Sequence, residues 1–283
     1  PGSMNIEKKM KAKSKEIQVP ISNPWFYKQF GQYLKLDSNN QLALEWEGLR
    51  YEILTNSQEL TDNADALAEI MVSNEWRAFM NISKEDMAQW IKVFAQFFAE
   101  KRLSYIVKDL NNNNKIGGLS LGLDFFEDTS HLEKLLPHCF SKESQFFKNV
   151  HDNSVRYIRD NIGVKKGTFV TFTKGAILKE YQNRKMSRKM LAIQNLESYR
   201  QGFRYLIREP TNPRTQNVIL SRNNSFLTNE YYHEGVINKE SYSDYESDGE
   251  KFTAPKTPMF PIPTIITTSY DLNNYSKMIH PKF

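Results

Sequence analysis

The stretch 167–221 constrains the fold most, because strand and helix patterns alternate within it over a short distance. It opens with an alternating run of β-branched and aromatic residues that ends at Leu178, and this run predicts a strand. A polar turn at 179–187 leads into a helical pattern that Gly202 ends, and a second strand pattern follows at 205–207. A strand, a helix and a second strand in this order predict a βαβ unit.

The helix of this unit combines an apolar stripe with basic charge. Its apolar positions follow helical spacing and predict one face toward the core: Met190, Leu191, Ile193, Leu196 and Tyr199. From Lys179 to Arg214 there are nine Lys and Arg and three Glu, a net charge of +6, against +5 for the whole chain. Because a helix that follows a strand presents free amides at its N-terminus, this basic entrance predicts a phosphate site. The alternative is a basic face that is merely solvated.

Composition bounds the class of protein. The chain has 283 residues, 39% of them hydrophobic, which is enough for one large domain. The single cysteine, Cys139, excludes an internal disulfide and a cysteine-based zinc site, so we expect a reducing, cytoplasmic compartment. The sequence has no run of about 18 apolar residues, so we expect no membrane span. The five histidines follow no metal-ligand spacing, so we expect no metal.

The remaining patterns divide the chain into elements. Pro1-Gly2-Ser3 ahead of Met4 is typical of a cloning scar, and we expect 1–20 to be this scar and a basic flexible arm before a single domain at 21–283. Further strands are predicted at 51–54, 104–107, 116–121 and 264–270, and helices at 61–79 and from Ser83 to Phe98. Residues 129–166 predict a helical insertion between the third and fourth strands, and 240–263 an acidic and proline-rich loop. The fold class is therefore mixed α/β, with an antiparallel half before the insertion and the βαβ half after it.

The turn carries a motif. Gln182-Asn183-Arg184-Lys185-Met186-Ser187, preceded by Tyr181, resembles the Gln/Arg-x-x-Gly-x-Gly/Ala signature with which the GNAT superfamily of N-acetyltransferases binds acetyl-CoA. The resemblance covers roughly 51–270 and is strongest to the insect dopamine and arylalkylamine N-acetyltransferases. It implies the GNAT fold, a central and mostly antiparallel mixed sheet flanked by helices.

The same resemblance implies a coenzyme site. The amides from Gln182 to Ser187 would hold the pyrophosphate, and Asn212 would contact the coenzyme. The strand would offer backbone groups to the pantetheine arm from Gly175, Ala176 and Ile177. Lys185 and Ser187 depart from the signature, because they stand where the family has glycine or alanine. Two readings stay open: the Lys185 ammonium contacts phosphate, or the site has degenerated.

The catalytic residues are also implied by resemblance. Asn74-Glu75-Trp76 resembles the Glu-Pro motif of the insect enzymes, in which the glutamate is the proposed general base for the ammonium. Thr211 and Thr215 match two serines of those enzymes and share one face of a predicted helix. The alternatives are a surface acid at Glu75 and a helix cap at Thr211. Ile219 stands where other members have a tyrosine acid.

The resemblance implies an acetyl-CoA-dependent N-acetyltransferase that acts on a primary amine, either a small arylalkylamine or a polyamine-like molecule. The amine would attack directly in a ternary complex. A catalytically silent GNAT-like binding or scaffold domain is one alternative, and a protein N-acetyltransferase with a protein partner is another. Nucleic acid is not expected as a partner, because the basic charge gathers where a coenzyme diphosphate would sit. His138-Cys139 has no partner spacing and is expected to hold a buried thiol.

Overall fold

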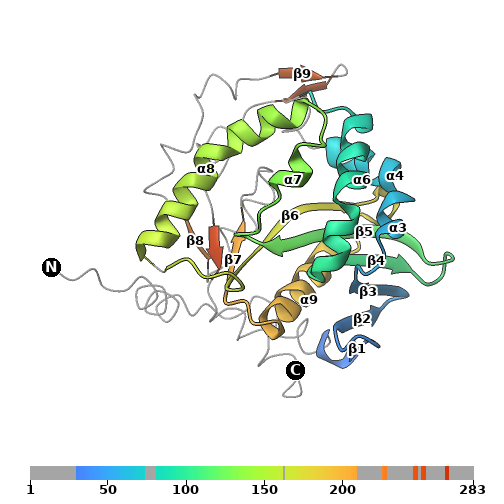
Figure 1. The fold of residues 1–283 in the computed structure, drawn as a ribbon. Coiled ribbons are helices and arrows are strands. Elements are labelled where there is room, and N and C mark those ends of the chain that lie inside the picture. Colours follow the sequence, from blue (N-terminus) through green and yellow to red (C-terminus); the bar gives the residue numbers. More distant parts are fainter. Residues whose placement is uncertain are drawn as a thin grey trace.

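The computed structural model describes residues 30–73, 81–161 and 163–208, together with four three-residue strands beyond them. A nine-stranded sheet forms the centre, in the order β1-β2-β3-β4-β5-β6-β7-β11-β8 (Figure 1). Its strands are β1 (Leu34–Leu36), β2 (Leu42–Trp46), β3 (Leu49–Ile53), β4 (Tyr105–Asp109), β5 (Lys115–Asp124), β6 (Phe169–Ile177), β7 (Tyr205–Arg208), β8 (Ser225–Leu227) and β11 (Ile265–Thr267). Neighbouring strands are antiparallel except β6 and β7, which are parallel.

The predicted fold class is confirmed: the sheet is mixed, mostly antiparallel and flanked by helices. The helices are α3 (Ser57–Thr61), α4 (Ala64–Val72), α6 (Lys84–Lys101), α7 (Ser130–Glu133), α8 (Cys139–Asn161), the 3-10 helix η1 (Lys179–Tyr181) and α9 (Met186–Arg200). The predicted start of α6 is correct, since the Ser83 side chain accepts a hydrogen bond from the Asp86 amide at 3.1 Å. The insertion is helical as predicted and consists of α7 and α8.

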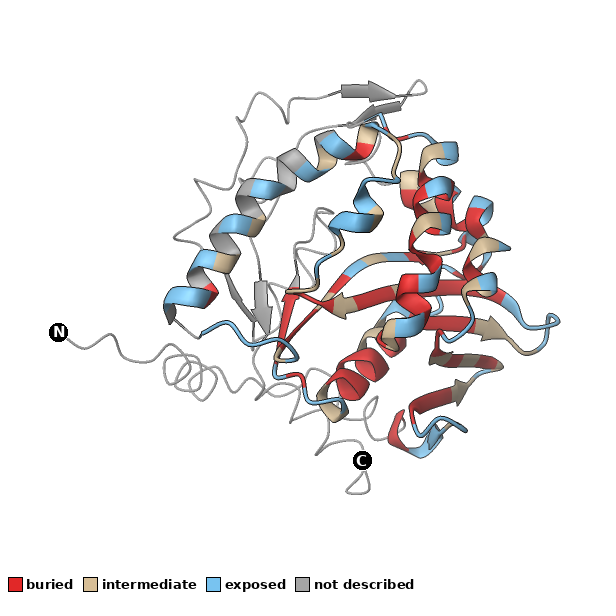
Figure 2. Ribbon diagram, viewed as in Figure 1, coloured by how far each residue is buried: buried red, intermediate tan, exposed pale blue. Residues whose placement is uncertain are grey.

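Helices cover the two faces of the sheet differently. Cross-strand partners in β5 and β6 share a face, because side chains alternate along each strand. On one face the Met186 sulfur of α9 lies against Gly118, and the Gln194 amide bonds to Ser120. On the other face lie Leu121 and its partner Lys174, which meets α6. Figure 2 shows that α9 is buried along most of its length, whereas most residues of α8 whose burial is described are exposed or intermediate.

The interior has one large and two smaller hydrophobic clusters. The large cluster joins β2 to β5 with α4, α6 and α9. It includes the stacked rings of Trp90 and Phe94, whose centroids lie 4.6 Å apart. A smaller cluster packs Ile158 of α8 against Phe125 and Phe169, so Phe125 is a core residue.

Several sequence predictions are wrong in detail. The strand predicted at 51–54 is not the first, because β1 and β2 precede β3; such short strands carry too little alternation to be recognised and depend on their pairing. The helix predicted at 61–79 begins later than expected, since α4 starts after its N-cap Asn63 and the short helix α3, which was not predicted, ends at Thr61. The predicted residues 74–79 lie outside the described ones. The acidic segment predicted as a loop contains the paired strands β9 (Tyr245–Ser247) and β10 (Glu250–Phe252).

Other expectations concern the helices. Within α9, Met190, Ile193 and Leu196 are buried as predicted, but five polar or charged residues are buried beside them: Lys189, Gln194, Asn195, Glu197 and Ser198. The helix is therefore enclosed on more than the predicted stripe. Among the described residues, no helix has both the length and the hydropathy that crossing a bilayer requires.

Candidate functional site

The turn between β6 and α9 has an unusual backbone. Asn183 and Lys185 both adopt left-handed conformations, with φ angles of 67° and 56°. Lys185 is the N-cap residue of α9 and makes no capping hydrogen bond through its side chain. This conformation is the one that glycine adopts without strain. The turn thus keeps the backbone shape expected of the glycine-containing signature, although a lysine occupies the position.

The backbone amides of this turn have no partner in the described part of the chain. Residues 183–187 donate no hydrogen bond there, and the first bond into α9 is that from the Lys189 amide to the Lys185 carbonyl. Successive amides with left- and right-handed dihedrals form a concave site for an anion, and the positive end of the helix dipole strengthens it. The geometry of the turn therefore suits a phosphate or pyrophosphate group.

Two glycines of β5 hold the turn in place. Gly117 is the extra residue of a bulge opposite Val107 and Lys108. A Cβ on Gly117 would lie only 3.0 Å from the Tyr181 ring. Gly118 leaves the corresponding space to the Met186 sulfur, also at 3.0 Å. Tyr181 and Met186 are buried and flank the turn on both sides. Gly117 and Gly118 are thus site-forming residues that the sequence analysis missed, although adjacent glycines inside a strand are a recognisable signal of close approach.

Polar contacts fix the same region. The Tyr181 hydroxyl donates to Asp109 Oδ2 at 2.8 Å, and burial raises the pKa of this phenol, so it stays a neutral donor. The Leu178 amide donates to the Gly117 carbonyl at 2.9 Å. Gln182 Nε2 donates to the Ile177 carbonyl at 3.2 Å, so this signature side chain braces the turn against β6.

Strand β6 extends beyond its described pairing with β7. β6 pairs with β7 only from Phe169 to Thr171, whereas its pairing with β5 continues to Ile177. Thr173 is an extra residue in β6, skipped between the pairs that Phe172 and Lys174 make with β5. Such a bulge bends its strand and increases the twist. From Phe172 onward, one edge of β6 therefore has no partner strand among the described residues, and it leads directly to the turn.

The predicted backbone contributors lie along this stretch. Gly175 is exposed, Ala176 is buried and Ile177 is half-buried, and all three pair with β5 on the other edge of β6. A Cβ at Gly175 would meet nothing closer than the Leu119 carbonyl at 3.5 Å. The structure thus brings Gly175, Ala176 and Ile177 into one continuous path with the amides of 183–187.

The basic charge is less concentrated than the sequence suggests. Lys179, Arg184 and Lys185 are exposed at the turn, and the Arg184 guanidinium lies 5.3 Å from the Tyr181 ring centre. Lys189, however, is buried, and its partners lie at the end of β2 and just after it. Its ammonium lies 3.2 Å from Glu47 Oε2 and 4.5 Å from the Trp46 ring centre. Lys189 therefore does not add an unpaired charge to the basic helix entrance that the sequence predicts.

Comparison with known proteins gives a fold. The sequence matches no protein-family model and no curated protein. The structure is similar to that of arylalkylamine N-acetyltransferase 2 from Aedes aegypti, with a TM-score of 0.54 and 14% identity over 79% of this chain and 100% of that one. It is also similar to the protein of the same mosquito named arylalkylamine N-acetyltransferase 7, with a TM-score of 0.52 and 12% identity over 84% and 93%. The chain has the GNAT fold.

The expected coenzyme residues 175–177 and 182–187 lie on β6, on α9 and in the turn between them, but several predicted residues lie outside the described ones: Glu75, Thr211, Asn212 and Thr215. Two described elements, α4 and β7, end close in sequence to these residues. Helix α4 packs against β6 and ends three residues before Glu75. Strand β7 ends three residues before Thr211, close to the point where its described pairing with β6 ends.

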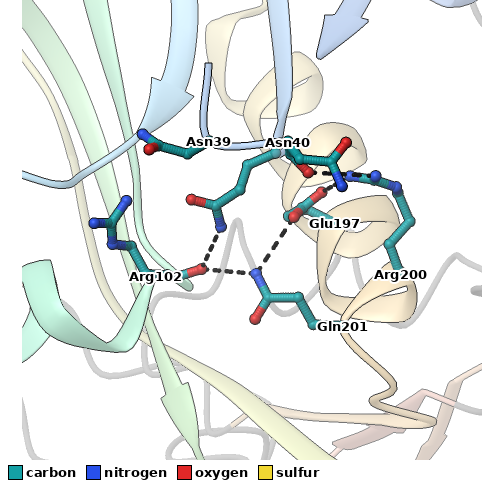
Figure 3. Close-up of a pocket in the computed structure, with 7 residues that line it drawn as sticks. Asn39, Asn40, Arg102, Glu197, Arg200 and Gln201 are labelled. Atoms are coloured by element: carbon teal, nitrogen blue, oxygen red, sulfur yellow. Dashed lines mark hydrogen bonds and ion pairs between the residues drawn. The ribbon is translucent and has the colours of Figure 1, made fainter. Parts of the chain in front are cut away.

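A second depression lies at the other end of α9. It has a volume of about 510 Å³ and is lined by Asn39, Asn40, Gln41, Arg102, Glu197, Arg200 and Gln201 (Figure 3). The Arg102 carbonyl accepts hydrogen bonds from the Gln41 and Gln201 amides, and Arg200 pairs with Glu197 at 2.6 Å. These bonds tie the ends of α6 and α9 to the turn before β2. The 15 residues of α9 separate this depression from the site by about 20 Å.

Two other candidate chemistries receive no support. Cys139 is half-buried and its thiol donates to Asp86 Oδ2 at 3.4 Å. Burial and the adjacent carboxylate raise the pKa of the Cys139 thiol to about 11, so it is a poor nucleophile. No group of three or more His, Cys, Asp or Glu side chains within the described ranges is arranged to hold a metal ion.

Proposed function

We propose that this protein is an acetyl-CoA-dependent N-acetyltransferase that acetylates a primary amine. One observation carries the proposal: β6 continues beyond its described pairing with β7 and leads to a turn whose amides at 183–187 make no hydrogen bond within the described residues. A strand edge without a partner offers groups to an extended amide-containing chain, and the turn offers a cradle for a diphosphate. Pantetheine and the pyrophosphate of coenzyme A have this chemistry and this order.

The coenzyme would be held in three parts. The amides between Gln182 and Ser187 would bind the pyrophosphate, with Arg184 and Lys185 adding positive charge. Residues Gly175 to Ile177 would hydrogen-bond the pantetheine arm, and Asn212 would contact the coenzyme. The left-handed backbone conformation of Lys185 is the one expected of the signature glycine. This conformation supports the interpretation in which the Lys185 ammonium contacts phosphate.

The reaction would be a direct transfer in a ternary complex. Glu75 would take a proton from the acceptor ammonium, since an ammonium has no lone pair with which to attack. The amine nitrogen would then form a bond to the thioester carbonyl carbon while the carbon–sulfur bond breaks. Backbone amides near Ile177 would stabilise the oxyanion, and Thr211 or Thr215 would assist departure of the thiolate. A small arylalkylamine or a polyamine-like molecule is the acceptor that we propose.

The first test is calorimetric titration with acetyl-CoA and with CoA. We expect micromolar binding that Arg184→Ala weakens about tenfold, because one charge-assisted contact to phosphate is removed. Arg159→Ala is the matched control, since Arg159 is an exposed arginine on α8. Absence of binding at millimolar coenzyme contradicts the proposal. Release of CoA from acetyl-CoA in the presence of candidate amines then tests turnover.

A silent binding module is the second candidate function. The observation in its favour is the replacement of the signature glycines by Lys185 and Ser187. This candidate predicts coenzyme binding without CoA release for any amine or peptide acceptor. Release with peptides alone would instead identify a protein N-acetyltransferase. In each case we propose a single domain at 21–283, because one sheet includes strands from β1 to β11.

A further inference from the structure

A lysine side chain is enclosed on the face of β6 that meets α6 and α8. The Lys174 ammonium lies 4.6 Å from the centre of the Trp90 ring, and its Nζ is 3.3 Å from Glu143 Oε1. Trp90 belongs to α6 and Glu143 to α8. An aromatic face and a carboxylate together form a good site for an ammonium group, since both attract the cation and the carboxylate also accepts its hydrogen bonds.

All three groups are withdrawn from water. The side chains of Lys174 and Glu143 are 8% and 13% exposed, and Trp90 is 6% exposed. Burial of a charged pair carries a large desolvation penalty, and apolar side chains of the same size often stabilise a fold equally well. Packing alone therefore gives no reason for a lysine and a glutamate at these two positions.

A similar group elsewhere provides a contrast. Lys189 lies 4.5 Å from the centre of the Trp46 ring and pairs with Glu47, but the Glu47 side chain is 63% exposed. The Lys189 ammonium is itself buried, on the α9 side of the sheet, but its carboxylate partner lies at the surface. The Lys174 group differs from it because its carboxylate is also enclosed, which strengthens the attraction between the charges.

The position of Lys174 links it to the proposed reaction. It directly follows the bulge at Thr173 and directly precedes Gly175, within the stretch of β6 that, among the described residues, has no partner on its β7 side. Its side chain and that of Leu121 share the face that α6 covers. An ammonium in this place lies beside the strand that would carry the thioester.

We propose that Trp90 and Glu143 form the recognition site for the ammonium group of the acceptor amine, and that Lys174 occupies this site in the resting chain. The inference rests on the proposed function and narrows its substrate class to amines with an ammonium at the end of a short, unbranched alkyl chain. The acceptor competes with Lys174 for the Trp90 ring and the Glu143 carboxylate. Lys174 thus weakens acceptor binding until it is displaced.

The test removes the internal ammonium and supplies it from solution. Lys174→Ala deletes three methylenes and the ammonium, which together match n-propylammonium. We expect this variant to bind n-propylammonium at least about tenfold more tightly than the unaltered chain, by calorimetric titration without coenzyme. Lys189→Ala is the matched control and should show no gain. n-Propanol, which has similar size and no charge, should bind neither variant. Adding Glu143→Gln to Lys174→Ala should remove the gain.

Equal binding of n-propylammonium by folded Lys174→Ala and Lys189→Ala overturns the proposal. If Lys174→Ala does not fold, the unaltered chain decides by acetic anhydride labelling read by peptide mass spectrometry. n-Propylammonium should raise the modification of Lys174 relative to Lys189, and an unchanged ratio overturns the proposal. Because neither experiment contains coenzyme, their failure is distinguishable from a failure to bind acetyl-CoA.

Discussion

Replacement of Lys185 by glycine tests the geometry of the turn. Lys185 has φ 56° and ψ 27°, a left-handed conformation that costs a residue with a Cβ about 1–2 kcal/mol. Glycine avoids this strain but loses about 0.4–1 kcal/mol more backbone entropy on folding. The Lys185 side chain makes no contact that offsets the change within the described residues. We therefore expect Lys185→Gly to stabilise the fold by about 1 kcal/mol, or about 2–4 °C in Tm.

The assay is unfolding in urea, with Lys185→Ala and Arg102→Gly as controls. Lys185→Ala keeps the Cβ and its strain, so its midpoint should match that of the unaltered chain. Arg102 is also left-handed, with φ 57°, at the end of α6, and its replacement by glycine should stabilise by a similar amount. A lower midpoint for Lys185→Gly than for Lys185→Ala would refute the strain argument.

Coenzyme affinity separates the two readings of Lys185. The backbone at position 185 is already left-handed, so glycine should not improve the shape of the loop for coenzyme binding. The lost ammonium should then weaken acetyl-CoA binding about fivefold, equally in Lys185→Gly and Lys185→Ala. Tighter binding by Lys185→Gly alone would show instead that the lysine side chain obstructs a degenerate site.

Three further predictions follow from single contacts. Gly117→Ala should destabilise the folded state by about 1–3 kcal/mol and weaken coenzyme binding, because its Cβ would lie 3.0 Å from the Tyr181 ring. Gly175→Ala makes only an ordinary contact and is the control. Urea unfolding compares the two variants. Burial lowers the pKa of His151, so the unfolded state binds a proton more readily than the folded state. The free energy of unfolding should therefore fall as the pH drops below about 6.5. His151→Phe should reduce this fall between about pH 7.5 and 5.5. Alkylation of Cys139 at pH 8 should be on the order of a hundredfold slower than that of a free thiol, and a rate equal to the free thiol would contradict its raised pKa.

The acceptor side of the site depends on contacts that no sequence pattern shows. Lys174 looks like an ordinary polar position of an alternating strand, and only the packing of α6 and α8 gives it Trp90 and Glu143 as neighbours. Gly117 and Gly118 were visible as a pair, but their purpose required Tyr181 and Met186 to be placed against them. Long-range contacts of this kind leave no local periodicity.

The sequence by itself determined the parts that local physics controls. The alternation in 167–178, the apolar stripe of α9 and the cap at Ser83 gave the βαβ unit and α6, and Gln182 to Ser187 marked the turn. Tertiary structure alone decided where the Lys189 charge goes, because its partner Glu47 is distant in sequence. It also decided the bulge at Thr173 and the pairing of β6 with β7, since a bulge and a strand pairing exist only between segments that the fold brings together.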